Sequence, residues 1–168
     1  MLVEAQYRRT GQASAVPHIP VPLVVIHHRF IGLTQRLREH RGAGMDELNV
    51  ITGAVVAAGI RIHQKLGPGL LESVYEVILA RDLARLGFRV ERQKPITFDF
   101  EGTRFEGVFR PDLIINDAVI VEVKAARAHD PVFQRQLLTY LRITNLRLGL
   151  VMNFGMETMK AGIRRIAN

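Results

Sequence analysis

The sequence predicts an α/β domain with a mixed central sheet flanked by helices. Three observations lead to this prediction: two segments with helical apolar spacing come first, short β-rich segments follow, and a further helical segment separates the last two expected strands. At 168 residues, with 48% hydrophobic and 23% charged residues, the chain has the length and composition of one globular domain.

Two helices are expected before the sheet. From Asp46 onwards, apolar residues recur at intervals of three and four, which places them on one face of a helix. These residues are Leu48, Ile51, Val55, Ala58 and Ile62. The glycines and proline at 67–69 end this helix, and a second helix is expected over residues 70–86, with Gly87 as its terminating glycine. Its apolar side is expected to hold Leu71, Val74, Ile78 and Leu79.

Extended segments rich in β-branched and aromatic residues follow these helices. They span residues 88–92, 96–100, 104–115 and 119–125. A turn at Glu101 and Gly102 joins two of them, and we expect the set to form an antiparallel meander. The domain is then completed by a helix over 131–144, an apolar strand over 148–154 and a short basic helix near the C-terminus.

Residues 1–44 lack a clear hydrophobic period, and we expect them to be a basic, proline-containing extension of a domain that spans residues 45–168. The extension holds six Lys/Arg and two Asp/Glu, so it carries +4 of the formal net charge of +7. Three interpretations fit it: a flexible arm, a mitochondrial-type presequence, or residues upstream of a true start at Met45. The overall positive charge attracts polyanions such as nucleic acid.

Two absences in the sequence limit the classes of function. No segment of about 18 uncharged apolar residues is present to span a bilayer. No cysteine is present either, which excludes disulfides and thiolate metal ligands. We therefore expect a soluble protein in which any metal ion is bound by oxygen or imidazole. The lack of cysteine permits a reducing compartment without requiring one, and the expected location is the cytoplasm.

A charged pair in an otherwise apolar strand marks the candidate site. Glu122 and Lys124 are two residues apart, so alternation along a strand puts both on one face. Removing each charge from water costs several kcal/mol, and something must compensate them. A lone E-x-K pattern is more often a structural ion pair, so its interpretation depends on the residues that accompany it.

Asp112 is the first accompanying residue, and its contribution depends on the length of the loop that follows its strand. A two-residue loop at 116–117 would pair Asp112 with Val121 and point its carboxylate away from that of Glu122. A three-residue loop, 116–118, or a bulge places Asp112 opposite Glu122. We predict the second arrangement, because two neighbouring carboxylates suit Mg²⁺. Carboxylates on opposite faces would exclude the site.

Three further residues accompany the strands. Glu72 falls in the first turn of the second helix, where the helix dipole favours its ionised form, although an ordinary first-turn glutamate fits equally well. Gln136 and Tyr140 are spaced i and i+4 on the helix over 131–144, so both project from one side. They either contact a phosphate or a base, or are internally hydrogen-bonded side chains.

Four segments, taken in order, resemble a known family. They are GLLESVY at 69–75, PD at 111–112, VEVK at 121–124 and QLLTY at 136–140. Together they are similar to the GxxExxY family of the PD-(D/E)XK nuclease superfamily over roughly residues 45–168, and to the arrangement in RecB-type exonuclease domains. The resemblance implies a restriction-endonuclease-like core.

The resemblance also implies roles for individual residues. Glu72, Asp112 and Glu122 would bind Mg²⁺ or Mn²⁺, with the Val123 carbonyl as a further ligand. Lys124 would face the scissile phosphate, and Gln136 and Tyr140 would complete the site from the helix that follows the sheet. The expected substrate is nucleic acid, DNA rather than RNA, and a domain this small suggests a homodimer or a larger protein partner.

Two other classes of function stay open from the sequence. One is a catalytically silent nucleic-acid-binding or regulatory subunit with the same fold, because a fold does not guarantee an activity. The other is a structural interaction protein in which Glu122 and Lys124 form only an ion pair. This last class predicts that divalent metal has no effect on stability.

Overall fold

The structure is a computed structural model that describes residues 43–168. Its elements are, in chain order, α2 (Met45–Leu66), α3 (Glu72–Arg85), β1 (Val90–Arg92), β2 (Ile96–Phe100), β3 (Thr103–Phe109), β4 (Leu113–Ile115), β5 (Val119–Lys124), α4 (Pro131–Thr144), β6 (Leu148–Asn153), α5 (Met159–Gly162) and β7 (Ile163–Ala167). The extension expected over residues 1–44 lies, up to residue 42, outside the described residues. Within residues 43–168, no helix has the length and apolar character needed to cross a membrane.

The central sheet has five strands in the order β1-β4-β5-β6-β7. Neighbouring strands are antiparallel except for β5 and β6, which are parallel. Helix α4 connects β5 to β6, as a parallel crossover requires. The expected mixed sheet flanked by helices is therefore confirmed, and β5 lies at its centre.

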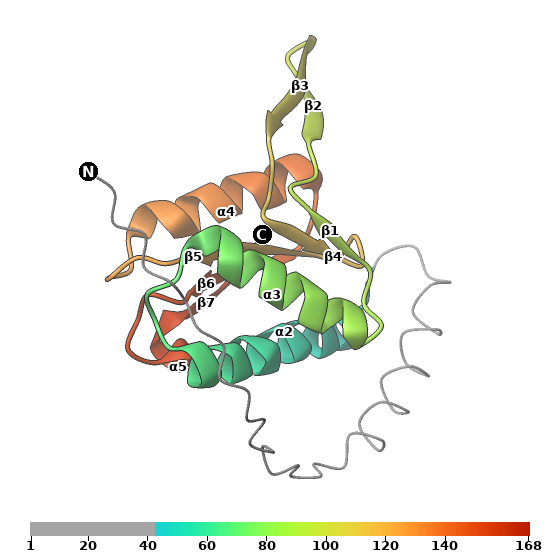
Figure 1. Ribbon diagram of the computed structural model, residues 1–168. Helices are drawn as coiled ribbons and strands as arrows, with labels where there is room; N and C mark the ends of the chain where they lie inside the picture. The colour runs from blue at the N-terminus through green and yellow to red at the C-terminus, as the bar shows by residue number, and fades with distance from the viewer. Residues whose placement is uncertain (1–42) are drawn as a thin grey trace, which may run out of the picture.

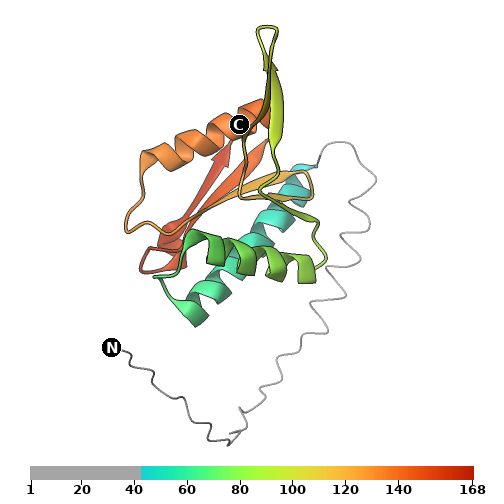
Figure 2. The ribbon, with the colours of Figure 1, turned by 45° about the horizontal axis from the view of Figure 1, so that its top comes forward.

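Helices cover both faces of this sheet (Figures 1 and 2). The larger core lies between α2, α3 and one face, and it includes Ile51, Val55, Tyr75, Leu79, Val121 and Val123. The smaller core lies under α4 on the other face and consists of Ile114, Ile120, Leu137, Leu141 and Val151. Because side chains alternate along β5, Glu122 and Lys124 share the α4 face with Ile120.

The long strand expected over 104–115 is two strands. Between β3 and β4 the chain passes through Pro111, which has no N–H to donate and restricts the residue before it. As a result β1 pairs directly with β4, while β2 and β3 form a separate two-stranded ribbon. The predicted meander was wrong in this respect, and Figures 1 and 2 show the ribbon standing away from the body.

Two smaller expectations were also corrected. The basic segment at the C-terminus is helical only at α5, and its two arginines lie in β7, the edge strand that pairs with β6. Leu71, the N-cap of α3, and Val74 are exposed, whereas Tyr75, Leu79 and Leu83 are buried. Of the residues expected on the apolar side, Leu79 is buried and Ile78 packs against the core, so the expectation holds for these two and fails for Leu71 and Val74.

Candidate active site

The loop between β4 and β5 places the carboxylates of Asp112 and Glu122 on the same face of the sheet. The register pairs Leu113 with Val121, which leaves a three-residue loop over 116–118. The first two loop residues have φ of 51° and 52°, a conformation that Asn and Asp tolerate better than most side chains. One step beyond the last pair, the same register places Asp112 opposite Glu122. The predicted register is confirmed.

Glu122 is a buried carboxylate with an incomplete set of partners. Its exposed fraction is 2%. Oε2 accepts a hydrogen bond from Lys124 Nζ at 3.2 Å, while Oε1 is buried and has no hydrogen-bond partner among the described residues. A buried carboxylate oxygen without a partner is costly, so this atom indicates a place for a ligand.

The environment shifts the pKa values of both partners upward. Burial is the largest cause that raises the pKa of Glu122, to about 7, and repulsion by Asp112 adds to it while Lys124 opposes it. Burial by itself lowers the pKa of Lys124, but attraction by three carboxylates outweighs it, so the ammonium stays charged. An additional positive charge beside Glu122 would favour its ionised form.

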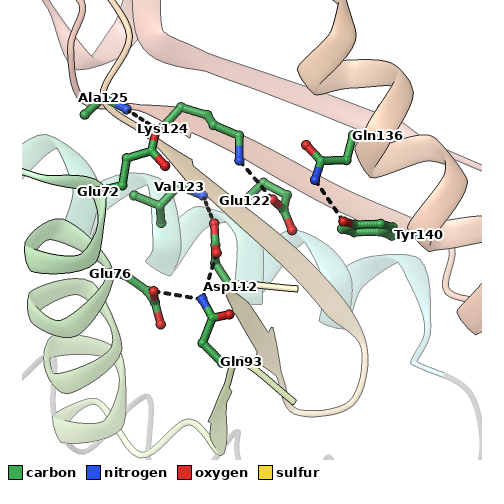
Figure 3. Close-up of polar contacts among 10 residues, drawn as sticks. All are labelled: Glu72, Glu76, Gln93, Asp112, Glu122, Val123, Lys124, Ala125, Gln136 and Tyr140. Carbon is green, nitrogen blue, oxygen red and sulfur yellow. Dashed lines mark hydrogen bonds and ion pairs between the residues drawn. The ribbon is translucent and has the colours of Figure 1, made fainter. Parts of the chain in front are cut away.

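Asp112 is held at both carboxylate oxygens. Oδ2 accepts from the backbone N–H of Val123 at 2.8 Å, and Oδ1 accepts from Gln93 Nε2 at 2.9 Å (Figure 3). The backbone N–H of Gln93 also donates to the Asp112 carbonyl at 3.1 Å. These bonds fix the position of the carboxylate without using all its lone pairs.

Gln93 is a site residue that sequence reasoning missed. Its Nε2 also donates to Glu76 Oε2 at 3.0 Å, and Arg92 Nε donates to Glu76 Oε1 at 2.9 Å. Glu76 is only 5% exposed. Gln93 itself has a φ of 49°, which few side chains other than Asn and Asp adopt. The sequence placed Glu76 one turn after Glu72, but no motif pointed to Gln93.

Glu72 is the first residue of α3, as the sequence predicted. Its exposed side chain accepts from the backbone N–H of Ala125 at 3.1 Å, at the end of β5 (Figure 3). The preceding loop is held by Tyr75, whose hydroxyl donates to the Gly67 carbonyl at 2.6 Å and accepts from the Leu70 N–H at 3.2 Å. Tyr75 thus positions the start of α3.

Gln136 and Tyr140 approach from α4. Gln136 Nε2 donates to the Tyr140 hydroxyl at 2.8 Å, so the two side chains do project from one side of the helix. Figure 3 shows this pair on the α4 side of Glu122. Phe133, one turn earlier, has its ring centroid 5.7 Å from Lys124 Nζ. The structure brings these α4 residues to the same face of β5 as Glu122 and Lys124.

The oxygen donors of this site fit a hard divalent cation. Mg²⁺ needs only one or two protein carboxylates, with water and phosphate oxygens completing its shell. Asp112 and Glu122 face each other, and Glu122 Oε1 has no other partner. As the side chains stand, residues 43–168 contain no group of three or more His, Asp or Glu arranged to hold a metal ion. Glu72 is bonded to Ala125 instead.

Comparison with known families decides the classification. A family model described as PD-(D/E)XK nuclease superfamily matches residues 49–166. The chain belongs to this superfamily. No curated protein and no solved structure matched the chain. The match begins within α2 and ends within β7, so it includes every residue assigned to the candidate site. The narrower GxxExxY assignment stays a prediction.

Membership gives the geometry a chemical context. PD-(D/E)XK nucleases act on nucleic acid and generally use divalent metal ions. In this PD-(D/E)XK protein the P-D residues lie just before β4 and the E-x-K residues on β5, and the register brings their acids together. The site lies where α3, the centre of the sheet and α4 converge (Figure 3).

Proposed function

We propose that this protein is a metal-dependent nuclease that hydrolyses phosphodiester bonds, with DNA as its substrate in preference to RNA. The observation that carries the proposal is Glu122 Oε1, a buried carboxylate oxygen without a partner, beside a charged lysine and a second carboxylate. An ion pair alone does not explain this atom, because Lys124 satisfies only Oε2.

Asp112 and Glu122 are the proposed primary ligands of Mg²⁺ or Mn²⁺. The proposal adds the Val123 carbonyl and Glu72, the latter through a bridging water or after leaving the Ala125 N–H. The bound cation would lower the pKa of a water molecule and offset phosphate charge. Gln93 and the Val123 N–H keep Asp112 in place. These residues bind and orient, and none of them transfers a proton in the proposal.

Lys124 is proposed to face the scissile phosphate. Attraction by neighbouring carboxylates keeps its ammonium charged, so it can orient the attacking water and stabilise charge that develops on the phosphate. Gln136 and Tyr140 are proposed to contact the phosphate or the adjacent base from α4. Their mutual hydrogen bond presets the two side chains for that contact.

The proposal also covers the location of the protein in the cell and its oligomeric state. We propose a cytoplasmic protein, and a homodimer or a larger partner wherever the substrate is a duplex, because one small domain offers little surface to a double helix. Light scattering on the protein with and without duplex DNA measures this. A monomer in both samples would contradict the assembly but not the chemistry.

The decisive experiment is cleavage of labelled single-stranded DNA, duplex DNA and RNA with and without Mg²⁺ or Mn²⁺. Wild type is compared with Lys124→Ala and Asp112→Ala, and with Lys160→Ala as a control, because Lys160 is exposed on α5, away from the site. We expect metal-dependent cleavage by wild type and the control only. Equal activity, or no activity, in all four proteins rejects the nuclease and favours a binding or regulatory subunit.

A further inference from the structure

The β2–β3 ribbon exposes large aromatic side chains. It forms its own two-stranded sheet and stands away from the central sheet and its helices (Figures 1 and 2). Phe100 is 60% exposed and Phe105 is 36% exposed. Exposed apolar groups gathered on one small surface mark a binding site more often than isolated ones do.

The two faces of the ribbon differ in character. Phe98 pairs with Phe105, and alternation puts Phe100 on the same face as Phe98. The charged residues Asp99, Arg104 and Glu106 alternate to the opposite face, where Arg104 Nε and Glu106 Oε1 are 2.9 Å apart. One face is therefore aromatic and uncharged, and the other holds the charged residues together with Val108.

Four rings, those of Phe105, Phe98, Phe109 and Tyr140, follow one another in contact towards α4, and Phe100 lies on the same face of the ribbon. Phe98 stacks on Phe105 with centroids 5.0 Å apart, and Phe98 lies 6.4 Å from Phe109. Phe109 stacks on Tyr140 at 4.3 Å with an interplanar angle of 18°. We name Phe100, Phe105, Phe98, Phe109 and Tyr140 the aromatic row. It runs from the exposed end of the ribbon into the body of the protein.

The aromatic row ends at the candidate active site. Tyr140 is hydrogen-bonded to Gln136 at 2.8 Å, and both lie on the α4 face of β5 near Glu122 (Figure 3). Phe133 on the same helix contacts Lys124. A polymer bound along the row would therefore lead towards the side of the sheet on which Glu122 and Lys124 lie. This continuity connects the ribbon to the chemistry of the site.

We propose that the aromatic row binds unpaired bases and that the substrate is a single-stranded nucleic acid or a single-stranded end. This inference rests on the proposed nuclease function. Bases of an intact duplex are stacked inside the helix and cannot reach these rings, whereas unpaired bases stack on aromatic side chains regardless of sequence. Arg110, which follows Phe109 directly and has no ion-pair partner within residues 43–168, is available to the phosphates.

The dimensions of the face argue against a second copy of this chain as its occupant. A five-residue strand is about 17 Å long, and a two-stranded ribbon is about 10 Å wide. The face therefore measures on the order of 200 Å², far less than the roughly 800 Å² that each partner of a stable dimer contributes. A few bases need no larger area, because each ring contributes separately.

Binding measured without metal tests this proposal. Full-length protein in a chelating buffer is titrated against a fluorescein-labelled DNA of about 20 nucleotides, longer than the span of one small binding fold. The same sequence is also supplied as a blunt duplex and as RNA. The variants are Phe100→Ala, Phe105→Ala and Phe105→Trp. Val108→Ala serves as the control, since Val108 is 55% exposed on the same ribbon but outside the row.

We expect wild type to bind the single strand at least about tenfold more tightly than the duplex. Each alanine variant should weaken single-strand binding about fivefold or more, whereas Val108→Ala and Phe105→Trp should retain it. The proposal is overturned if the alanine variants bind the single strand as tightly as wild type, or if Val108→Ala weakens binding as much as they do. It is also overturned if the variants change only the oligomeric state measured by sedimentation. The affinities for single-stranded DNA and for RNA of the same sequence show which of the two polymers the aromatic row prefers.

Failure of this inference is distinguishable from failure of the nuclease proposal, because binding in chelator does not require cleavage. If the protein binds single strands through the rings but cleaves no substrate, the aromatic-row proposal stands and the nuclease proposal is rejected. If the protein cleaves with metal but the ring variants bind single strands as wild type does, the nuclease proposal stands and the aromatic-row proposal is rejected.

Discussion

Glu122 makes the stability of the metal-free protein depend on pH. Its pKa rises from 4.5 to about 7 in the folded state, so the folded protein binds this proton more tightly than the unfolded chain does. The resulting stabilisation is fully present below pH 4.5 and is lost as the pH rises through about 7. The whole loss is about 3 to 4 kcal/mol, at about 1.4 kcal/mol per pKa unit.

We therefore expect Glu122→Gln to remove this dependence. Urea unfolding in chelator, between about pH 5 and pH 8, should show wild type losing up to about 3 kcal/mol relative to Glu122→Gln. Parallel stability curves for the two proteins would show that Glu122 is ionised throughout, and that its burial is compensated by groups of the protein itself.

Gln93 is expected to act on metal binding through Asp112. Gln93→Ala removes the donor to Asp112 Oδ1 and leaves Glu76 Oε2, in a buried side chain, without that donor. We expect metal affinity to fall about 10- to 100-fold and the free energy of unfolding to fall by about 1–3 kcal/mol.

Calorimetric titration with Mn²⁺ and urea unfolding measure the two effects of Gln93→Ala separately. Gln64→Ala is the matched control, because Gln64 is exposed on α2. If Gln93→Ala loses stability but binds Mn²⁺ as wild type does, Gln93 is structural only.

The sequence identified some site residues and missed others for a physical reason. Glu122 and Lys124 follow from strand alternation, and Asp112 follows once the loop length is chosen correctly. Gln93 reaches Asp112 only because its backbone turns into a left-handed conformation between β1 and β2. No local pattern in the sequence encodes that contact, so a motif search has nothing to detect.

The start of α3 is an element whose position depends on one side chain. Tyr75 stacks on Phe154 with centroids 4.4 Å apart, and its hydroxyl bonds two backbone groups of the preceding loop. We expect Tyr75→Phe to keep the stacking and lower the free energy of unfolding by about 1–2 kcal/mol. Faster amide hydrogen exchange at residues 67–72 should accompany it. Unchanged exchange there would mean that the loop is held by other contacts.

Strongly periodic elements were predictable, and elements set by long-range pairing were not. The bounds of α2 and α4 follow from apolar spacing, glycine and the proline at the start of α4. The hairpin of the ribbon was predicted, but its separation from the central sheet and the strand β7 were not, because both depend on partners distant in the sequence. A basic segment such as 163–167 becomes a strand only because β6 offers an open edge.

At the scale of the molecule, the candidate site lies where α3, the central sheet and α4 meet. A bound cation should therefore stabilise the whole fold. Mn²⁺ at about 100 times its dissociation constant should raise the free energy of unfolding by about 2.7 kcal/mol. Thermal unfolding with and without Mn²⁺ measures this, and Asp112→Asn should abolish the increase. A wild type indifferent to Mn²⁺ would leave the structural ion pair as the better explanation of the E-x-K residues.

The separation of the β2–β3 ribbon from the body has a consequence for evolution. Of the ribbon residues, only Ile96 packs against either core. Replacements at exposed ribbon positions such as Phe100 and Phe105 are therefore expected to change what the ribbon binds, with little effect on folding. If the proposed function holds, natural selection can change the preferred polymer while Asp112 and Glu122 stay the same. For the same reason, a protein engineer can exchange the exposed end of this ribbon while Ile96 and Phe109 keep their contacts with the body.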